Sequence, residues 1–318
     1  MREKGDSSKN KKIVFMGTPN IATYALNSLI DCGFDVVAVV TQPDKPIGRN
    51  KKIVFSDVKQ LAIEKNIKIF QPNKIGEIKN ELQDLKPFAF VTCAFGQFIP
   101  SSILEIPEFG TVNIHASLLP KYRGGAPIHW AIINGEKETG VSLMETIKKM
   151  DAGKVYSNMK TEIFETDTTT TLFNKMNKLV YEIIARDLNK VFNKELLGIE
   201  QDESKVSFAY NITKENEKLN FNDSASNIIN WIKGLSDTPG AYCYLKEKKV
   251  KLFNAAKTNV NSTNKPGTIV DINKNGLIIA TKDYDICVHE VQVEGKNRTQ
   301  IKNIINGKHD FIKKEVLV

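Results

Sequence analysis

The segment that could carry chemistry is Asn113-Ile114-His115, which ends a short apolar run beginning at Thr111. Side chains two positions apart on a β-strand project from the same face, so the Asn113 amide and the His115 imidazole would point the same way. An amide can donate a hydrogen bond to a developing negative charge, and an imidazole can exchange protons near neutral pH. The same residues could instead satisfy loop carbonyl groups, so the pair alone leaves both interpretations open.

Several other chemistries lack their motifs. Gly17-Thr18-Pro19 follows the first apolar run and supplies only one glycine where a dinucleotide site needs G-x-G-x-x-G, and Pro19 removes an N–H. The phosphate-loop pattern G-x-x-x-x-G-K-[ST] is absent from the sequence. Ser117 lies outside a G-x-S-x-G elbow, and Cys93 has no basic sequence neighbour to lower its thiol pKa. We therefore expect neither a nucleotide cofactor of these kinds nor a covalent nucleophile.

Metal and disulfide sites are not expected from the sequence either. The four cysteines lie far apart and form no C-x-x-C pair. The four histidines (His115, His129, His289 and His309) show no metal-ligand spacing. His129 lies in an apolar helical pattern beside Trp130, which favours a structural role.

Short apolar runs alternate with helical patterns through the first half of the chain. Strands are predicted at residues 12–16, 36–41, 67–70, 88–94, 111–115 and 141–146, and helices at 19–32, 56–66, 126–134 and 168–198. This alternation predicts an α/β fold with an open, mostly parallel, Rossmann-like sheet. Ligands bind beyond the carboxyl ends of the strands in such sheets, which is where Asn113 and His115 stand.

The pattern changes beyond Asn220. A helix is predicted at 225–233, followed by short strands at 241–245, 250–255, 267–271, 277–281 and 286–293, with turn signals such as Asn275-Gly276. This pattern predicts a small β-barrel of OB type. We expect a polar tail at residues 1–11, a catalytic domain at 12–200, a linker at 201–208 and a C-terminal domain at 209–318.

Composition indicates an ordinary globular protein of 318 residues, 41% hydrophobic and 26% charged. No apolar run approaches the ~18 residues that span a bilayer, and the first ten residues lack the apolar core of a secretory signal. We therefore expect a cytoplasmic protein without membrane association. The net charge of +8 arises mainly in the C-terminal third. This excess would favour an anionic partner, although a lysine-rich composition alone would produce it as well.

The Asn113–His115 pair belongs to a longer signature. N-x-H-x-S-x-L-P at residues 113–120, followed by Asp151-Ala152-Gly153, closely resembles the 10-formyltetrahydrofolate-dependent formyltransferases. In that family the asparagine, histidine and aspartate of the signature are catalytic, which implies Asn113, His115 and Asp151 here. The resemblance implies 10-formyltetrahydrofolate as formyl donor and no metal. The implied folate-binding residues are Ser117, Leu118, Leu119, Pro120, Phe95, Gly96 and Gln97.

Formyl transfer to an amine gives this trio defined tasks. The tetrahedral intermediate carries a negative oxygen, and a preorganised donor such as the Asn113 amide would stabilise it by ~3 kcal/mol. His115 would take a proton from the amine and give one to the departing folate nitrogen. Asp151 would orient the ring and stabilise its charged form. No covalent acyl-enzyme is needed.

Further segments resemble the branch of this family that acts on methionyl-tRNA, namely residues 16–19, 41–46, 94–100 and 123–128. Resemblance covers nearly the whole chain and implies initiator methionyl-tRNA as the partner. Lys45, Arg49, Lys51 and Lys52 lie in a Pro- and Gly-bearing loop that would contact tRNA phosphates. A solvated surface loop would have the same composition.

Two alternatives to this function stay open. One is a formyltransferase acting on a sugar-nucleotide or phosphoribosyl amine, which would share the trio but differ in the basic loop and in the C-terminal third. The other is a non-catalytic RNA-binding protein that keeps the sheet as a scaffold. We expect the methionyl-tRNA activity, in a monomer.

Overall fold

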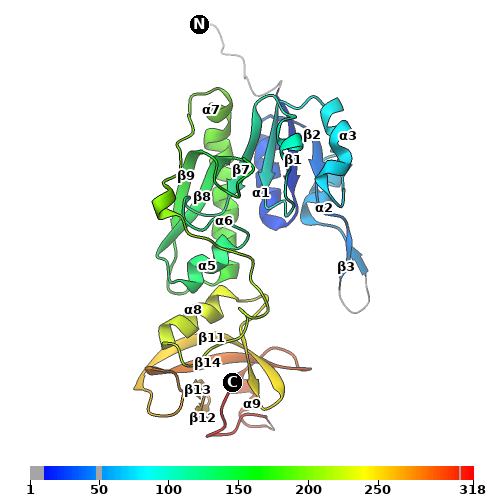
Figure 1. Cartoon of the computed structure of the whole chain (residues 1–318). Helices are drawn as coiled ribbons and strands as arrows, with labels where there is room; N and C mark the ends of the chain where they lie inside the picture. Colours follow the sequence, from blue (N-terminus) through cyan, green and yellow to red (C-terminus); the bar gives the residue numbers. More distant parts are fainter. Residues whose placement is uncertain (1–10, 48–51, 308) are drawn as a thin grey trace. The chain divides into compact units, whose positions relative to one another are not determined.

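The computed structural model describes residues 11–47, 52–307 and 309–318 (Figure 1). The chain divides into two compact units. The first contains Met1–Pro127, Thr139–Thr161 and Phe173–Tyr210, and the second contains Ile128–Glu138, Glu162–Leu172 and Asn211–Val318. Residues 201–208, which we expected to form a linker, therefore group with the first unit. The predicted domain limits themselves stay a prediction.

The first unit is built on a seven-stranded sheet with strand order β5-β2-β1-β6-β7-β8-β9. The strands from β5 to β7 pair in parallel, and β8 is antiparallel to β7. The predicted open, mostly parallel sheet is thus confirmed, with β9 as an additional strand that we did not predict. The strand bounds are β1 (Lys12–Gly17), β2 (Asp35–Val40), β5 (Ile69–Phe70), β6 (Ala89–Cys93), β7 (Gly110–His115), β8 (Glu138–Glu145) and β9 (Val155–Glu162).

Helices cover both faces of the parallel strands. On one face, Val14 and Met16 of β1 join a buried cluster with Ile75, Leu82 and Ile103 from the helical segments η1, α3 and α4. On the other face, α1 packs against β1, β2 and β6 and contacts α2. A parallel sheet needs this double cover because both of its faces are apolar. The bounds are α1 (Asn20–Asp31), α2 (Asp57–Glu64), η1 (Ile75–Ile78), α3 (Lys79–Asp84), α4 (Ser101–Leu104) and α5 (Pro127–Ile133).

The helix predicted at 168–198 is shorter and less regular than expected. It consists of α6 (Thr169–Ile183), a π-helical turn (Ile184–Leu188) and α7 (Asn189–Phe192). The helix ends there because Lys194 adopts a left-handed backbone with φ of 60°. Gly198 does not end the helix. Instead it allows the backbone to pass close to Lys154, whose Cβ would lie 2.6 Å from a Cβ at this position.

The second unit contains an antiparallel sheet with strand order β10-β11-β14-β13-β12, and β15 pairs with β14. The end of the chain joins the two edge strands. Tyr244 and Val318 exchange N–H···O bonds of 2.6 and 2.9 Å, and the Ile269 N–H donates to the Glu315 carbonyl at 2.8 Å. The sheet therefore closes into a small barrel, as predicted. The bounds are α8 (Ala225–Gly234), β10 (Tyr242–Leu245), β11 (Lys248–Asn261), β12 (Ile269–Asn273), β13 (Gly276–Ile279), β14 (Tyr284–Val293), β15 (Thr299–Gln300) and α9 (Ile301–Ile304).

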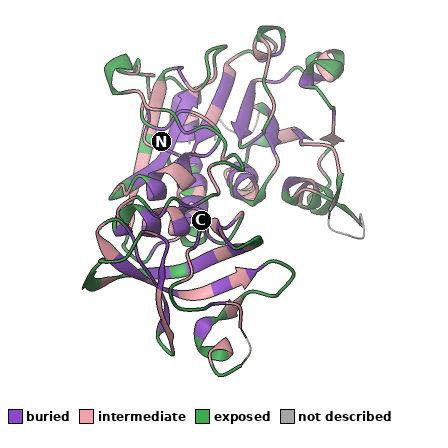
Figure 2. Cartoon of the chain, turned by 60° about the horizontal axis from the view of Figure 1, so that its bottom comes forward, coloured by how far each residue is buried: buried purple, intermediate pink, exposed green. Residues whose placement is uncertain are grey.

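The barrel has a continuous apolar interior. Along β11, Val250 and Leu252 are buried whereas Lys249 and Lys251 are only partly buried, the two-residue alternation of a sheet with one solvated face. From α8, Ile228 and Ile232 join the same cluster. Figure 2 shows buried stretches in purple along the strands and helices of the chain.

Leu317 offers a test of barrel closure. Its side chain is 2% exposed, whereas its neighbour Val318 is 57% exposed. We expect Leu317→Ala to lower the free energy of unfolding of this unit by about 2–5 kcal/mol because it removes a buried side chain. Val318→Ala is the control. Because the Val318 side chain is exposed, this substitution should change the free energy of unfolding by less than about 0.5 kcal/mol.

Urea unfolding followed by tryptophan fluorescence would measure this difference. Both tryptophans, Trp130 and Trp231, lie in the second unit and pack edge to face at 5.8 Å. Equal effects of the two substitutions would contradict the closure by the chain end.

Candidate active site

Strand β7 presents Asn113 and His115 on one face. It lies between β6 and β8 in the sheet, and its register places Asn113 beside Thr92 of β6 and His115 beside Ser142 of β8. His115 is only 6% exposed, whereas Asn113 is partly exposed. Because both residues lie in strand β7 two positions apart, their side chains project from the same face of the sheet.

Thr92 orients the Asn113 side chain. The buried Thr92 hydroxyl donates a hydrogen bond of 2.7 Å to Asn113 Oδ1. With the carbonyl oxygen engaged, the amide nitrogen Nδ2 is the donor end that faces away from Thr92. Sequence analysis did not identify Thr92, whose only signal is a hydroxyl within an otherwise apolar strand.

The His115 ring is held from two sides. Nε2 lies 2.9 Å from the Tyr122 carbonyl oxygen, and Nδ1 lies 3.7 Å from Asp151 Oδ2. Because a carbonyl can only accept, Nε2 must carry a proton in this arrangement. The 3.7 Å separation is too long for a hydrogen bond but short enough for a charge interaction. The structure thus brings together two of the three residues that the family signature marks as catalytic.

Asp151 lies in the connection from β8 to β9 with a left-handed φ of 47°. A non-glycine residue held in this region carries strain of about 1–3 kcal/mol, so the surroundings must stabilise it. The Gly124 N–H donates to Asp151 Oδ2 at 2.8 Å. Gln201 Nε2 donates to the backbone carbonyls of Asp151 and Gly153 at 2.8 and 2.7 Å. Gly153 itself is required because a Cβ would lie 2.0 Å from the Glu145 carbonyl oxygen.

Arg123 anchors Gln201 by bonding the oxygen end of its side-chain amide. Its fully buried guanidinium donates to Gln201 Oε1 from Nε at 3.1 Å and from Nη2 at 2.9 Å. Nη2 also donates to Glu203 Oε1 at 2.8 Å. Bonds from Arg123 and Lys149 lower the pKa of the Glu203 carboxyl. Gln201 was not identified by sequence analysis because it begins a charged run with no recognisable motif.

The segment after Gln201 continues along the same loop. The Arg123 N–H donates to the Ser207 carbonyl at 2.9 Å, and the Ala209 N–H donates to the Arg123 carbonyl at 2.7 Å. The Tyr122 N–H donates to the Ser207 hydroxyl oxygen at 3.0 Å. Residues 201–209 therefore run alongside the loop at residues 122–124. This loop contacts both His115 and Asp151.

The residues expected to bind folate divide into two groups. In the first group, the Ser117 hydroxyl is buried and donates to the Lys121 carbonyl at 2.7 Å, Leu119 is buried, and Leu118 and Pro120 are partly buried. These residues shape the turn between β7 and the Tyr122 loop.

The second group follows β6. The Phe95 side chain packs into the core, whereas Gly96 is exposed with a φ of 79°. The Gln97 amide accepts from the Ile75 N–H at 2.8 Å and donates to the Pro72 carbonyl at 3.0 Å. Both ends of the Gln97 amide are therefore bonded to the protein backbone. The contribution of Gln97 to a ligand site would be to stabilise the conformation of the loop at residues 95–97.

Neither candidate nucleophile has a reactive setting. Burial raises the pKa of the Cys93 thiol to about 12, so the thiol stays protonated at neutral pH. The Ser117 hydroxyl is occupied by the Lys121 carbonyl and no histidine accepts its proton. Within residues 11–47, 52–307 and 309–318, no group of three or more His, Cys, Asp or Glu side chains could hold a metal ion.

The basic residues expected to contact tRNA are only partly described. The loop after β2 forms a short antiparallel hairpin of β3 (Lys45–Ile47) and β4 (Lys52–Val54), where we expected no strands. Lys45 is exposed at its start and Lys52 begins the second strand. Arg49 and Lys51 lie outside the described residues.

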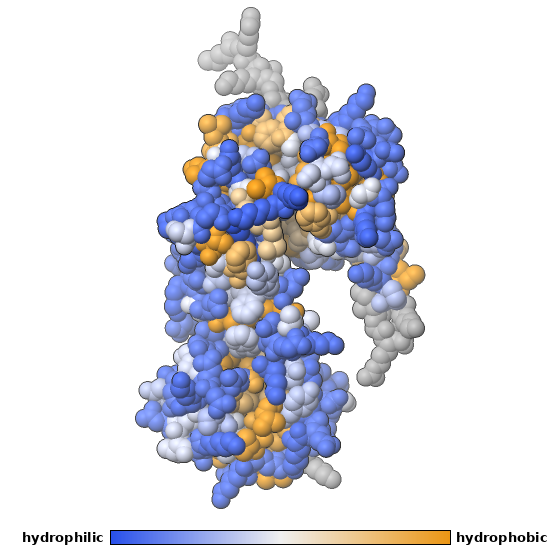
Figure 3. Space-filling model, viewed as in Figure 1, coloured by the Kyte–Doolittle hydropathy of each residue, from blue (hydrophilic) through white to orange (hydrophobic). Residues whose placement is uncertain are grey.

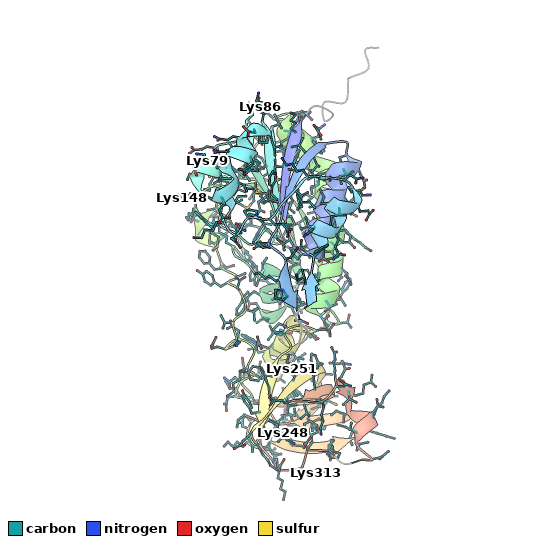
Figure 4. All side chains as sticks on the ribbon, turned by 90° about the vertical axis from the view of Figure 1, so that its right-hand side faces the viewer. Lys79, Lys86, Lys148, Lys248, Lys251 and Lys313 are labelled. Atoms are coloured by element: carbon teal, nitrogen blue, oxygen red, sulfur yellow. The ribbon has the colours of Figure 1, made fainter. Side chains whose placement is uncertain are left out.

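The barrel surface is predominantly hydrophilic on the face seen in Figure 3. Figure 4 labels Lys248, Lys251 and Lys313 in this unit. Lys248 pairs with Asp310 at 2.9 Å and Lys313 with Asp271 at 2.6 Å, so part of the basic excess is neutralised locally. In the part of the chain that the structure describes, no helix has the length and apolar character needed to cross a membrane.

Comparisons with known proteins show the family of this chain. Residues 11–188 match the family described as formyl transferase, and residues 211–309 match its C-terminal domain. The chain is 70% identical to the methionyl-tRNA formyltransferase of Malacoplasma penetrans over 98% of both chains. It is 42% identical to that of Mycoplasma capricolum, covering 95% of this chain and 96% of the relative.

A solved structure shares the fold. The sugar 3N-formyl transferase WlaRD superposes with a TM-score of 0.65 at 23% identity, over 90% of this chain and 99% of that one. By these matches, the chain belongs to the formyl transferase family and, within it, to the methionyl-tRNA formyltransferases.

Proposed function

We propose that this chain transfers the formyl group of 10-formyltetrahydrofolate to the α-amino group of initiator methionyl-tRNA, as a cytoplasmic step of translation initiation. The observation that carries the proposal is the placement of Asn113 and His115 at the end of β7 with Asp151 beside the ring. The names of the relatives support the tRNA substrate. WlaRD, solved in the presence of 5-N-formyl-THF, supports a folate donor.

In the first step the amine nitrogen attacks the formyl carbon. The carbonyl electron pair moves to oxygen, which becomes negative in the tetrahedral intermediate. Asn113 Nδ2 is the donor proposed to meet this oxygen, because Thr92 engages the other end of the amide. A preorganised donor of this kind supplies about 3 kcal/mol of transition-state stabilisation.

The proton movements fall to His115. Since Nε2–H is bonded to the Tyr122 carbonyl, Nδ1 is the nitrogen left to accept the proton of the attacking amine. The Asp151 carboxylate, 3.7 Å away, stabilises the resulting imidazolium. The ring then gives this proton to N10 of the folate as the bond between N10 and the formyl carbon breaks. The products are the formylated amine and tetrahydrofolate.

We propose that the folate lies against the turn at Ser117 to Pro120 and the loop at Phe95 to Gln97. Two bonds fix the second loop, because Thr18 Oγ1 and Gln42 Nε2 donate to the Phe95 carbonyl at 3.1 and 3.2 Å. A Cβ on Gly96 would meet only the Gln42 amide within 4 Å, so the surface there is open. This open, fixed surface leaves room for a flat ring, which supports the assignment.

The activity is tested by formyl transfer from 10-formyltetrahydrofolate to charged initiator tRNA. We expect turnover by the wild-type chain and a loss of about 10²–10⁴-fold in His115→Ala, the range associated with general acid–base catalysis. Turnover with a sugar-nucleotide or phosphoribosyl amine but not with methionyl-tRNA would reassign the substrate. Undiminished activity in His115→Ala would remove the catalytic role of the ring.

Thr92 gives a sharper test of the Asn113 assignment. Thr92→Val keeps the shape of the side chain but frees the Asn113 amide to rotate, so we expect kcat to fall by about 10–100-fold. KM for both substrates should change little, because the donor is proposed to act on the developing oxyanion. Thr92→Ser retains the hydroxyl and should keep most of the activity. Equal kcat in the two variants would contradict the orienting bond.

Arg49 tests the proposed tRNA contact of the basic residues in the segment 45–52. If the Arg49 guanidinium neutralises a phosphate, Arg49→Ala should weaken tRNA binding and reduce the slope of log K against log[salt] by about 1. Lys79→Ala, a charge removal on α3, serves as the control and should leave both quantities unchanged. An unchanged salt slope in Arg49→Ala would remove this contact from the proposal.

A further inference from the structure

Gln201 uses both ends of its side-chain amide inside the protein. Nε2 donates to the carbonyls of Asp151 and Gly153, and Oε1 accepts two bonds from the Arg123 guanidinium. All four bonds lie between 2.7 and 3.1 Å. The bonds to Arg123 allow only one orientation of the amide, because a reversed amide would place its NH₂ group against the guanidinium donors.

This orientation acts on the backbone of Asp151. Gln201 Nε2 donates to the carbonyl of Asp151 itself, whose φ is 47°, and to the carbonyl of Gly153 two residues later. Within the described part of the chain, the backbone bond at this turn from the Ala152 N–H to the Lys149 carbonyl is long, at 3.4 Å. Gln201 is therefore a principal contact that favours the strained conformation over a relaxed one.

Arg123 makes this contact rigid. Its guanidinium is fully buried, so the positive charge needs fixed acceptors close by. Gln201, which is partly buried, supplies one such acceptor, while the Glu203 side chain is 60% exposed and so is screened by water. Gly124, which follows Arg123 in the chain, donates its N–H to the Asp151 carboxylate itself. One loop thus holds Asp151 at its side chain directly and at its backbone through Gln201.

We propose that Gln201 is a positioning residue for Asp151: anchored by Arg123, it holds the backbone turn that places the Asp151 carboxylate beside His115. The proposal rests on the catalytic role proposed for Asp151. Gln201 does not touch the reacting groups and acts only through this turn. Its removal should therefore impair the chemical step and leave the binding of both substrates nearly intact.

Two substitutions separate this role from simple support of Arg123. Gln201→Glu keeps an acceptor for the guanidinium but replaces the donor with an oxygen that repels both carbonyls. Gln201→Met has a similar length and removes all four bonds. We expect kcat to fall about 10–100-fold in both variants, as for a small misplacement of a catalytic group, with KM changed less than about threefold. Gln83→Glu on α3, exposed and outside the site, is the matched control and should retain full activity.

The deciding measurement repeats Gln201→Glu in an Asp151→Asn background, under single-turnover conditions. If Gln201 acts through the Asp151 carboxylate, the second substitution should cause less than about a twofold further loss. A further loss as large as in the wild-type background would overturn the proposal, as would unchanged kcat in Gln201→Glu. Circular dichroism of each variant would check its folding, and Gln201→Met replaces Gln201→Glu in the cycle if the latter does not fold.

The same data separate this proposal from the one it rests on. If Asp151→Asn alone leaves kcat unchanged, the catalytic role of Asp151 is wrong and the role of Gln201 falls with it. If Asp151→Asn lowers kcat but Gln201→Glu does not, only the positioning role is wrong. A large rise in KM for tRNA with unchanged kcat would instead assign Gln201 to substrate binding.

Discussion

The proposed active site depends on one buried imidazole that lies between a carbonyl and a carboxylate. His115 has its Nε2 proton bonded to Tyr122, so only Nδ1 is left for proton exchange, and Asp151 stands beside that nitrogen. Because Tyr122 and Gly124 belong to one short loop, the same backbone fixes the ring and the carboxylate. A single element thereby sets the distance on which acid–base chemistry at this site depends.

The rest of the first unit serves to hold that loop. The double-covered sheet fixes β7, and Thr92 of the adjacent strand fixes the amide of Asn113. The chain then returns after α7 and lays residues 201–209 along the loop, where Gln201 joins Arg123 to the turn at Asp151. Stability and the proposed chemistry are therefore coupled here: a buried charge, a strained backbone and the carboxylate proposed to be catalytic share one network of hydrogen bonds.

Sequence reasoning was effective where a pattern is local. Alternating apolar runs predicted the sheet and the barrel, and the two-residue spacing of Asn113 and His115 predicted that they share a face. Asp151 came only through resemblance, because nothing in its spacing shows that the β8–β9 connection reaches His115. Edge strand β9 has a weak apolar pattern and was not predicted. Thr92 and Gln201 act through tertiary contacts with residues far along the chain, and a local sequence pattern does not specify such contacts.

The most direct test of this arrangement is to determine which tautomer His115 adopts when its ring is neutral. Long-range ¹H–¹⁵N correlation spectra of the histidine-labelled protein, with the His115 signals identified by their loss in His115→Ala, would show which ring nitrogen carries the proton. We predict protonation at Nε2, with Nδ1 unprotonated and facing Asp151. A neutral ring protonated at Nδ1 would contradict the bond to Tyr122 and, with it, the proton path through the site.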